Sequence, residues 1–330
     1  MKTTVSMQFI GYVLYVAPVL VAANASAQDV AAFPAKTIRV IVPAAPGGGA
    51  DIIARLFAQP LTRSLGQSVV VDNRAGAANI IGTELVAKSP ADGYTLLLGT
   101  TGGLANNPLL YLKLPYDSLR DFAPVSNVAN SAFVLVVHPS MPVKTVTELV
   151  TLAKRKPGEL SYASWGKGSS THLATMLLTT RAQLDFVHVP YKGSGHMMPD
   201  MIAGNVQMAF DSMLSSVPYV KAGRLRALGV TALKTSAVLP GVPTIASAGF
   251  EGFEAGSWYG VLAPAKTAPQ IVSKLNGELL KAIKLPEVLD RMASLGTDPL
   301  GTTPAEFSEQ IKADLAKWAK VVKAAGIQPE

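Results

Sequence analysis

Short apolar runs alternate with longer amphipathic stretches through most of the chain. In the first third, runs rich in Val, Ile and Leu are typical of buried strands, and the stretches between them repeat apolar residues with a period near 3.6, which is typical of helices. The elements follow in the order strand 37–42, helix 51–65, strand 68–71, helix 83–88 and strand 94–98. This βαβαβ order predicts a parallel sheet with helices on its faces, and Pro60 predicts a kink in the first helix.

A second series of the same kind begins near residue 133. Thr145 and Glu148 have the spacing of a capping box, so they predict the start of a helix that ends at Pro157 and Gly158. The other expected elements are strands 133–140, 160–163, 186–189, 206–210 and 225–231, with helices 172–180 and 197–203. This part of the chain therefore predicts a second α/β domain.

The last part of the chain has too few strands to form a domain of its own. It holds one expected strand, 258–262, followed by helices only, the last of which starts at Thr303 and Pro304. The simplest arrangement returns this part to the first domain. We therefore expect a discontinuous domain of residues 28–131 plus 253–330, an inserted domain of residues 132–252, and a cleft between them that closes by a hinge motion.

The first residues have the pattern of a secretory signal. Lys2 precedes an uncharged run over residues 11–23, and Ala25-Ser26-Ala27 is a small-x-small cleavage pattern. The run is shorter than the roughly 20 apolar residues that span a bilayer, which disfavours a membrane anchor. We expect residues 1–27 to be removed on export and the mature chain to reach the periplasm.

The composition narrows the classes of function. The chain of 330 residues contains no cysteine, which excludes disulfides and thiolate metal sites. Its net charge is +7, but the basic residues are scattered without a nucleic-acid-binding motif, so this charge favours only an anionic ligand. The four histidines, at 138, 172, 188 and 196, form no metal-ligand motif. We therefore expect no metal, cofactor or nucleic-acid partner.

Two glycine-containing loops are the candidate binding elements. The first, "PGGGAD" at residues 46–51, lies between an expected strand and helix, where backbone N–H groups and the helix N-terminus attract an anion. It has neither the G-x-G-x-x-G spacing of a dinucleotide site nor the lysine of a P-loop, and its alternative role is a tight turn. Asp51 would repel a bare anion, so we expect it to cap the helix or tie down the loop.

The second loop, "SYASWGKGSSTHL" at residues 161–173, has the same position in the second domain. Its glycines free the backbone, and its hydroxyl side chains stand beside a helix start, so two facing loops, one from each lobe, would clamp an anion. Ser169 and His172 leave a second hypothesis open, a secreted serine hydrolase acting on a carboxylic ester. The stretch lacks the G-x-S-x-G motif of such enzymes.

The chain resembles the Bug receptors, which are the extracytoplasmic solute receptors of tripartite tricarboxylate transporters. The resemblance spans nearly the whole mature chain and rests on the stretches "IRVIVPAAPGGGADIIAR", "GQSVVVDNRAGAANIIG", "ADGYTLLLGT", "LPYDSLRDFAPV", "VHVPYKGSG", "LPGVPTIASAG" and "KWAKVVKAAGI". It implies the two-lobed α/β fold of type II periplasmic binding proteins and no enzymatic activity. It also implies a monomer that binds a small carboxylate (a di- or tricarboxylate, an amino acid or an aromatic acid) and delivers it to the membrane components of the transporter.

The same resemblance assigns ligand-binding positions. They are Pro46, Gly47, Gly48, Gly49, Asp51, Thr101, Gly168, Ser169, Ser170, His172, Tyr191 and Asp211. Ala50 replaces a hydroxyl residue common in the family, Ala75 replaces a proline, and Lys167 replaces a small or polar residue. These departures leave the identity of the acid open. A sensor that signals to a membrane kinase is a further alternative that the sequence does not separate from a transport receptor.

Overall fold

The computed structural model describes Met1, residues 33–324 and residues 328–329. Apart from Met1, the predicted signal segment 1–27 lies outside the described residues. Within the part of the chain that the structure describes, no helix is both long and apolar enough to cross a bilayer.

The first lobe contains the expected parallel sheet. Strand β1 (Ile38–Val42) lies between β2 (Val69–Asn73) and β3 (Thr95–Thr100) and is parallel to both. Helices α1 (Gly49–Leu65) and α2 (Ile80–Ala87) provide the crossovers, so the predicted βαβαβ order is confirmed. Helix α1 continues through Pro60. After β3 the chain forms a π-helical turn (Gly102–Asn106) and the short helix α3 (Asn107–Leu110).

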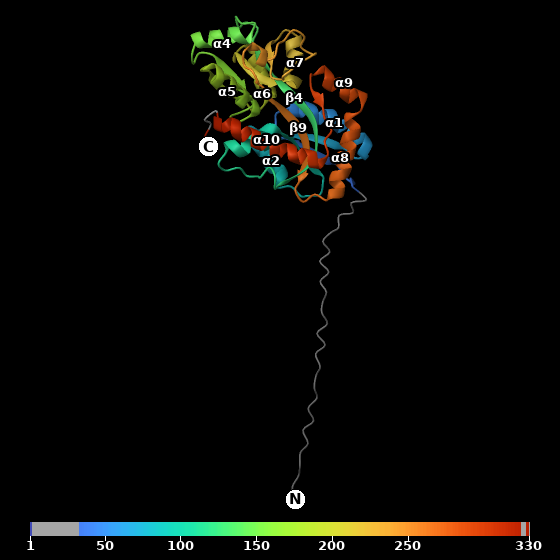
Figure 1. Cartoon of the computed structure of the whole chain (residues 1–330). Helices are drawn as coiled ribbons and strands as arrows, with labels where there is room; N and C mark the ends of the chain where they lie inside the picture. The colour runs from blue at the N-terminus through green and yellow to red at the C-terminus, as the bar shows by residue number, and fades with distance from the viewer. Residues whose placement is uncertain (2–32, 325–327, 330) are drawn as a thin grey trace.

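Strand β4 (Phe122–Val137) belongs to both lobes. Its first half pairs antiparallel with β9 (Gly256–Pro264) as far as the Ala132–Gly256 pair, and its second half pairs with the second lobe from Phe133 onward. Among the described residues the strand order is β2-β1-β3-β9-β4-β7-β5-β6, with β8 and β10 paired to β4. Figure 1 shows β4 and β9 running between the first lobe below and the second lobe above.

The second lobe repeats the α/β pattern. Strands β5 (Ser161–Ser164) and β6 (Val187–Pro190) are parallel, β7 (Met208–Ser212) is parallel to β5, and β8 (Arg226–Val230) pairs with β4. Apolar cores cover both faces of this sheet, one around Phe133 and Phe210 and the other around Met197 and Met201. The helices are α4 (Val146–Arg155), α5 (Ser170–Ala182), α6 (Ser194–Ala203) and α7 (Met213–Lys221).

The start of α4 confirms the predicted cap. The side chain of Thr145 accepts a hydrogen bond from the Glu148 amide at 3.1 Å, and the Glu148 carboxylate accepts one from the Lys144 amide at 2.6 Å. These bonds satisfy donors that the helix itself leaves without acceptors.

The C-terminal part of the chain packs against β4, α1 and α3. Helices α8 (Pro269–Ile283), α9 (Pro286–Ser294) and α10 (Pro304–Ala324) follow β9, and Thr303 caps α10 together with Glu306. The expectation of helices only after β9 was wrong, because the two-residue strand β10 (Asp298–Pro299) pairs with β4.

Candidate functional site

Loops from both lobes enclose a small pocket on the α1 side of β4 and β9, named here the interlobe pocket. The first lobe contributes the end of β3 and the start of α1, the second lobe contributes the segments after β5 and β6, and Tyr259 of β9 lies between them. The lining residues are Ala44, Gly48, Gly49, Ala50, Asn79, Thr100, Trp165, Gly193, Ser194 and Tyr259. Carboxyl ends of parallel strands meet here, which is where open α/β sheets bind ligands.

The start of α1 presents backbone donors to the interlobe pocket. Gly48 is the N-cap residue of α1, has an extended backbone (φ −79°, ψ 166°) and supplies no side-chain cap. The first N–H groups of a helix have no acceptor within the helix, and together with the helix dipole they attract an anion. Gly49 and Ala50, the next two residues, also line the pocket. The Gly48 amide donates to the Ala45 carbonyl at 3.3 Å, so the amide donors that this helix start brings to the pocket are those of Gly49 and Ala50.

Asp51 ties the first glycine loop down. Its Oδ2 accepts a hydrogen bond from the Gly47 amide at 2.9 Å, and its Oδ1 accepts one from Nε of Arg55 at 2.9 Å. The side chain is buried and ion-paired, which offsets its negative charge next to the pocket. Gly47 adopts φ +78°, a conformation that favours glycine. Asp51 thus has the structural role expected from its charge.

Helix α6 presents a second uncapped N-terminus to the same pocket. Its N-cap residue, Gly193, has φ 121° and supplies no side-chain cap, and Ser194 follows it in the pocket wall. A Cβ atom at Gly195 would lie only 1.9 Å from the carbonyl oxygen of Pro46, so this loop touches the first glycine loop across the lobes. Two helix N-termini, one from each lobe, therefore border one pocket.

Asp211 holds two residues of the second-lobe wall of the interlobe pocket in place by hydrogen bonds. It is fully buried, and its carboxylate accepts hydrogen bonds from Trp165 Nε1 at 2.8 Å, Ser194 Oγ at 2.5 Å and Ser216 Oγ at 2.7 Å. Burial raises the pKa of Asp211 above the ordinary value of an aspartate, against the opposing effect of these hydrogen bonds. Asp211 does not line the interlobe pocket, but it fixes two side chains that do.

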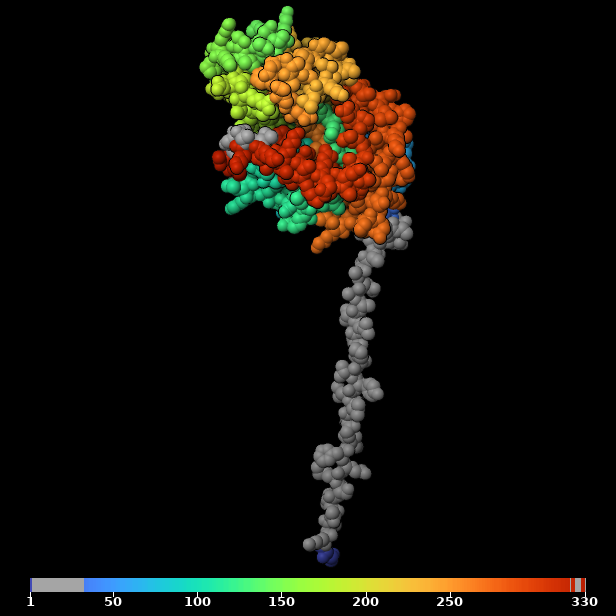
Figure 2. Space-filling model, viewed as in Figure 1, coloured from blue at the N-terminus to red at the C-terminus, as the bar shows by residue number. Residues whose placement is uncertain are grey.

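The second glycine loop, within residues 161–173, makes contacts that hold the lobes together. Ser170 Oγ accepts a hydrogen bond from Asn106 Nδ2 of the first lobe at 3.0 Å, and the carbonyl of Lys167 accepts one from the Tyr111 hydroxyl at 3.0 Å. Each glycine loop is therefore opposed by a different segment of the other lobe. Figure 2 shows the second lobe, in green to light orange, above the first lobe.

Ser169 and His172 lack the arrangement of a catalytic pair. Ser169 is the N-cap of α5, and its Oγ accepts a hydrogen bond from the backbone amide of His172 at 3.3 Å. The ring Nδ1 of His172 accepts a hydrogen bond from the Gly168 amide at 3.1 Å. Gly168 and His172 line a separate small pocket with Leu110 and Lys167. In this geometry both side chains shape the loop.

The remaining expected site residues lie around the interlobe pocket without lining it. Pro46 and Gly47 line an adjacent cavity against α6 and α7. Thr101 Oγ1 accepts a hydrogen bond from the Trp258 amide at 3.1 Å, on the opposite side of β9. The hydroxyl of Tyr191 donates to Asp200 Oδ2 at 2.7 Å. Burial and this bond raise the pKa of Tyr191 to about 12.

Several pocket residues were absent from the sequence-based set. Asn79 has a left-handed backbone (φ 78°) and its Nδ2 donates to Thr100 Oγ1 at 3.2 Å, while Trp165 and Ser194 come from the second lobe. Thr100 ends β3, and Trp165 follows directly after β5. Applying the rule of carboxyl strand ends to every strand, and not only to glycine-rich loops, would have found Thr100 and Trp165.

A two-lobed α/β protein with this pocket between its lobes is a solute-binding receptor. The chain matches the model of the family described as "Tripartite tricarboxylate transporter family receptor" over residues 53–327, and it belongs to this family. It is 38% identical over 314 residues to protein BugT of Bordetella pertussis, covering 95% of each chain.

Solved structures show the same likeness. The structure described as R. palustris Rpa4515 with adipate has a TM-score of 0.88 and 38% identity, and the match covers 90% of this chain and all (100%) of that one. MatC from Rhodopseudomonas palustris with bound malate has a TM-score of 0.84 and 30% identity, covering 88% of this chain and 100% of that one. The resemblance to the Bug receptors and the two-lobed fold are confirmed.

Proposed function

We propose that this receptor binds a small carboxylate in the interlobe pocket, in the periplasm, and delivers it to the membrane components of a tripartite tricarboxylate transporter. The observation that carries the proposal is the pair of uncapped helix N-termini, those of α1 and α6, that border one pocket from opposite lobes. Two such termini supply amide donors and two partial positive charges to one anion.

The relatives support an acid as the ligand, since their structures hold adipate and malate. We assign direct ligand contacts to the amides of Gly49 and Ala50 in the first glycine loop, with Gly193 and Ser194 opposite. Gly168, Ser169, Ser170 and His172 serve closure instead, because their contacts run along the second glycine loop or across to the first lobe. The receptor performs no reaction on its ligand.

We propose the lobe boundaries expected from the sequence, residues 28–131 plus 253–330 and residues 132–252. They are supported by the change of partner within β4 between Ala132, which pairs with β9, and Phe133, which pairs with β7. One chain supplies both sides of the interlobe pocket, so we propose that the receptor acts as a monomer.

A thermal-shift screen against a panel of carboxylates, followed by calorimetric titration of each hit, tests this function. A ligand at about 100 times its dissociation constant stabilises the folded state by roughly 2.7 kcal/mol, which is a clear shift in melting temperature. We expect saturable binding of an acid and no turnover of its ester. Failure of every small carboxylate to bind would contradict the proposal.

N-terminal sequencing of protein recovered from the periplasm tests export. We expect the mature chain to begin at Gln28, after Ala27. Soluble periplasmic protein that retains Met1 would contradict the predicted cleavage.

A further inference from the structure

A strained turn of the first lobe lies beside the interlobe pocket. Ala77, Ala78 and Asn79 have φ angles of 43°, 47° and 78°, so three successive residues with side chains adopt the left-handed conformation. This conformation is unfavourable for alanine, whose side chain cannot compensate by a local hydrogen bond. Backbone strain persists only where the surrounding structure holds it, and it collects at binding sites. The turn is therefore examined for what it places in the pocket.

Two side chains hold the strained turn. Asn107 Nδ2 donates to the Ala78 carbonyl at 2.8 Å, and Thr83 Oγ1 donates to the Asn79 carbonyl at 2.8 Å. The turn brings the side chain of Asn79 to the pocket wall, where Nδ2 donates to Thr100 Oγ1 at 3.2 Å. Within the described part of the chain, the Asn79 side chain has no other hydrogen-bond partner. One N–H and the oxygen Oδ1 therefore remain for a ligand.

The wall of the interlobe pocket is uncharged. Among the described residues that line it, none has a charged side chain. Arg55 pairs with Asp51 at 2.9 Å and donates to Asn73 at 3.1 Å, and Lys167 lines a separate pocket. The carboxylate of Asp211 lies behind the wall and is fully buried. A second charge on the ligand would be buried here without an opposite charge beside it, which is costly.

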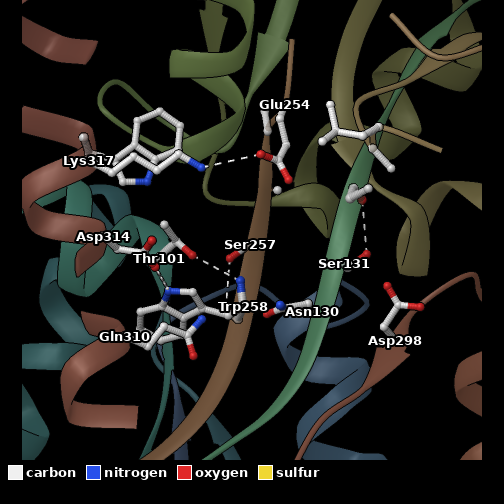
Figure 3. Close-up of a pocket in the computed structure, with 16 residues that line it drawn as sticks. Thr101, Asn130, Ser131, Glu254, Ser257, Trp258, Asp298, Gln310, Asp314 and Lys317 are labelled. Atoms are coloured by element: carbon white, nitrogen blue, oxygen red, sulfur yellow. Dashed lines mark hydrogen bonds and ion pairs between the residues drawn. The ribbon is translucent and has the colours of Figure 1, made fainter. Parts of the chain in front are cut away.

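Charged side chains gather instead around a cavity on the opposite face of β4 and β9, as Figure 3 shows: Glu254, Asp298, Asp314 and Lys317. Trp258 lines that cavity, and the next residue, Tyr259, lines the interlobe pocket. Successive side chains of a strand point to opposite faces, so the strands separate these charges from the ligand. The charge presented to the ligand therefore comes from the helix N-termini.

The two helix N-termini are close enough to share one carboxylate. The amide nitrogen of Ser194, at the start of α6, lies 3.9 Å from the position of a Cβ atom on Gly48, at the start of α1. Beside them the wall presents the ring of Trp165, which is fixed by its bond to Asp211 and by an edge contact with Phe133 at 5.4 Å between ring centroids. The pocket thus combines one anion site with aromatic and neutral polar surface.

We propose that the ligand is a monocarboxylate whose remaining part is uncharged and carries a hydroxyl group, and that Asn79 selects this hydroxyl. The inference rests on the proposed carboxylate function and narrows it. The amide of Asn79 can both donate to a hydroxyl and accept from one. It offers no countercharge to the second carboxylate of a diacid or to the ammonium group of an amino acid.

Calorimetric titration with three acids of equal chain length tests the selectivity. The three are the acid with a terminal hydroxyl, the diacid and the unsubstituted acid, compared at each length from three to six carbons at neutral pH. We expect the hydroxy acid of the best-fitting length to bind about fivefold tighter, or more, than either of the other two.

Variants of Asn79 test whether this residue is responsible. Asn79→Gly removes the amide and keeps the left-handed backbone accessible. Gln183→Gly is the matched control, because Gln183 is an exposed amide residue with φ 54° that does not line the pocket. We expect the difference between the hydroxy acid and the unsubstituted acid to disappear in Asn79→Gly and to persist in Gln183→Gly. Asn79→Lys supplies the absent cation and should make the diacid bind tighter than the hydroxy acid.

If Asn79→Lys does not fold, Asn79→Gly still decides the inference. A parent protein that binds a diacid at least as tightly as the hydroxy acid would overturn the inference and leave the carboxylate function standing. The same holds if Asn79→Gly keeps the preference for the hydroxyl. Binding of none of these acids, or of any acid in the wider screen, would overturn both the inference and the proposed function.

Discussion

Replacing Gly48 by serine at the start of α1 should weaken ligand binding without destabilising the fold. The backbone at Gly48 is already extended (φ −79°), which suits a serine N-cap, and an added Cβ would lie 3.4 Å from the Ala45 carbonyl oxygen and 3.9 Å from Ser194 Cβ. The new hydroxyl can accept a hydrogen bond from an amide two or three residues on. The amide two residues on, that of Ala50, is one of those proposed to hold the ligand carboxylate.

The two expected effects differ in sign and size. Replacing a glycine cap by serine stabilises a helix by only about a few tenths of a kcal/mol, so the melting temperature should stay level or rise slightly. The loss of one hydrogen bond between a backbone amide and the charged carboxylate of the ligand weakens binding by about 1.5 to 3 kcal/mol. The dissociation constant should therefore increase about 10-fold to 150-fold.

Calorimetric titration and thermal unfolding of Gly48→Ser, beside the parent, measure both quantities. Gly277→Ser in α8 is the control, because a Cβ there meets no atom within 4 Å and the residue is outside the interlobe pocket. If Gly48→Ser stays folded and binds its acid as tightly as the parent, the amides of α1 do not hold the carboxylate. A matching loss of affinity in Gly277→Ser would show that the effect is not local.

Three further predictions concern closure and charge. Gly49→Ala should weaken binding more than about 10-fold without unfolding the first lobe, because the new Cβ would lie 2.4 Å from the Tyr259 hydroxyl oxygen. In calorimetric titrations the double variant Gly49→Ala, Tyr259→Phe should recover part of the lost affinity. Ser170→Ala should weaken binding about fivefold by removing the bond from Asn106, and unchanged affinity would exclude a closure role. Burial raises the pKa of Asp211, so the folded protein binds the Asp211 proton more tightly than the unfolded chain does. Proton binding therefore stabilises the folded state. This contribution to the free energy of unfolding is fully present below the pKa of the unfolded chain and is lost as pH rises through the pKa of the folded state. Denaturant unfolding across pH should show that loss in the parent and not in Asp211→Asn; equal slopes would contradict it.

The sequence predicted the strands that follow simple apolar patterns and missed half of the strand that joins the lobes. The run after residue 133 was expected, but β4 begins at Phe122, and its first half carries buried polar residues. Ser126 Oγ donates to the Thr302 carbonyl at 2.9 Å, and Asn127 Nδ2 donates to Gln310 Oε1 at 2.9 Å. Partners about 175 residues away make these polar positions suitable for a buried strand, and such partners are invisible in a local pattern.

The candidate site was predictable where local chemistry decides it. Asp51 was expected to cap the helix or tie the loop down, and its bond to the Gly47 amide depends only on neighbours within a few residues. The places of Trp165, Ser194 and Tyr259 depend on how two lobes meet. Asp211 illustrates the same difficulty, since its contacts with Trp165 and Ser194 join separate strand ends.

The strand order also sets when the protein can fold. In the first lobe β9 lies between β3 and β4, yet it begins at Gly256, after the whole second lobe has been made. Until that segment is available, β3 and the first half of β4 have open edges and the sheet has a gap in its middle. Closing the gap requires pairing Leu97 with Leu262, across a long stretch of chain, and such non-local pairing is slow. The first lobe therefore cannot complete its sheet until the chain beyond Gly256 has been synthesised, so this sheet stays unfinished through most of translation.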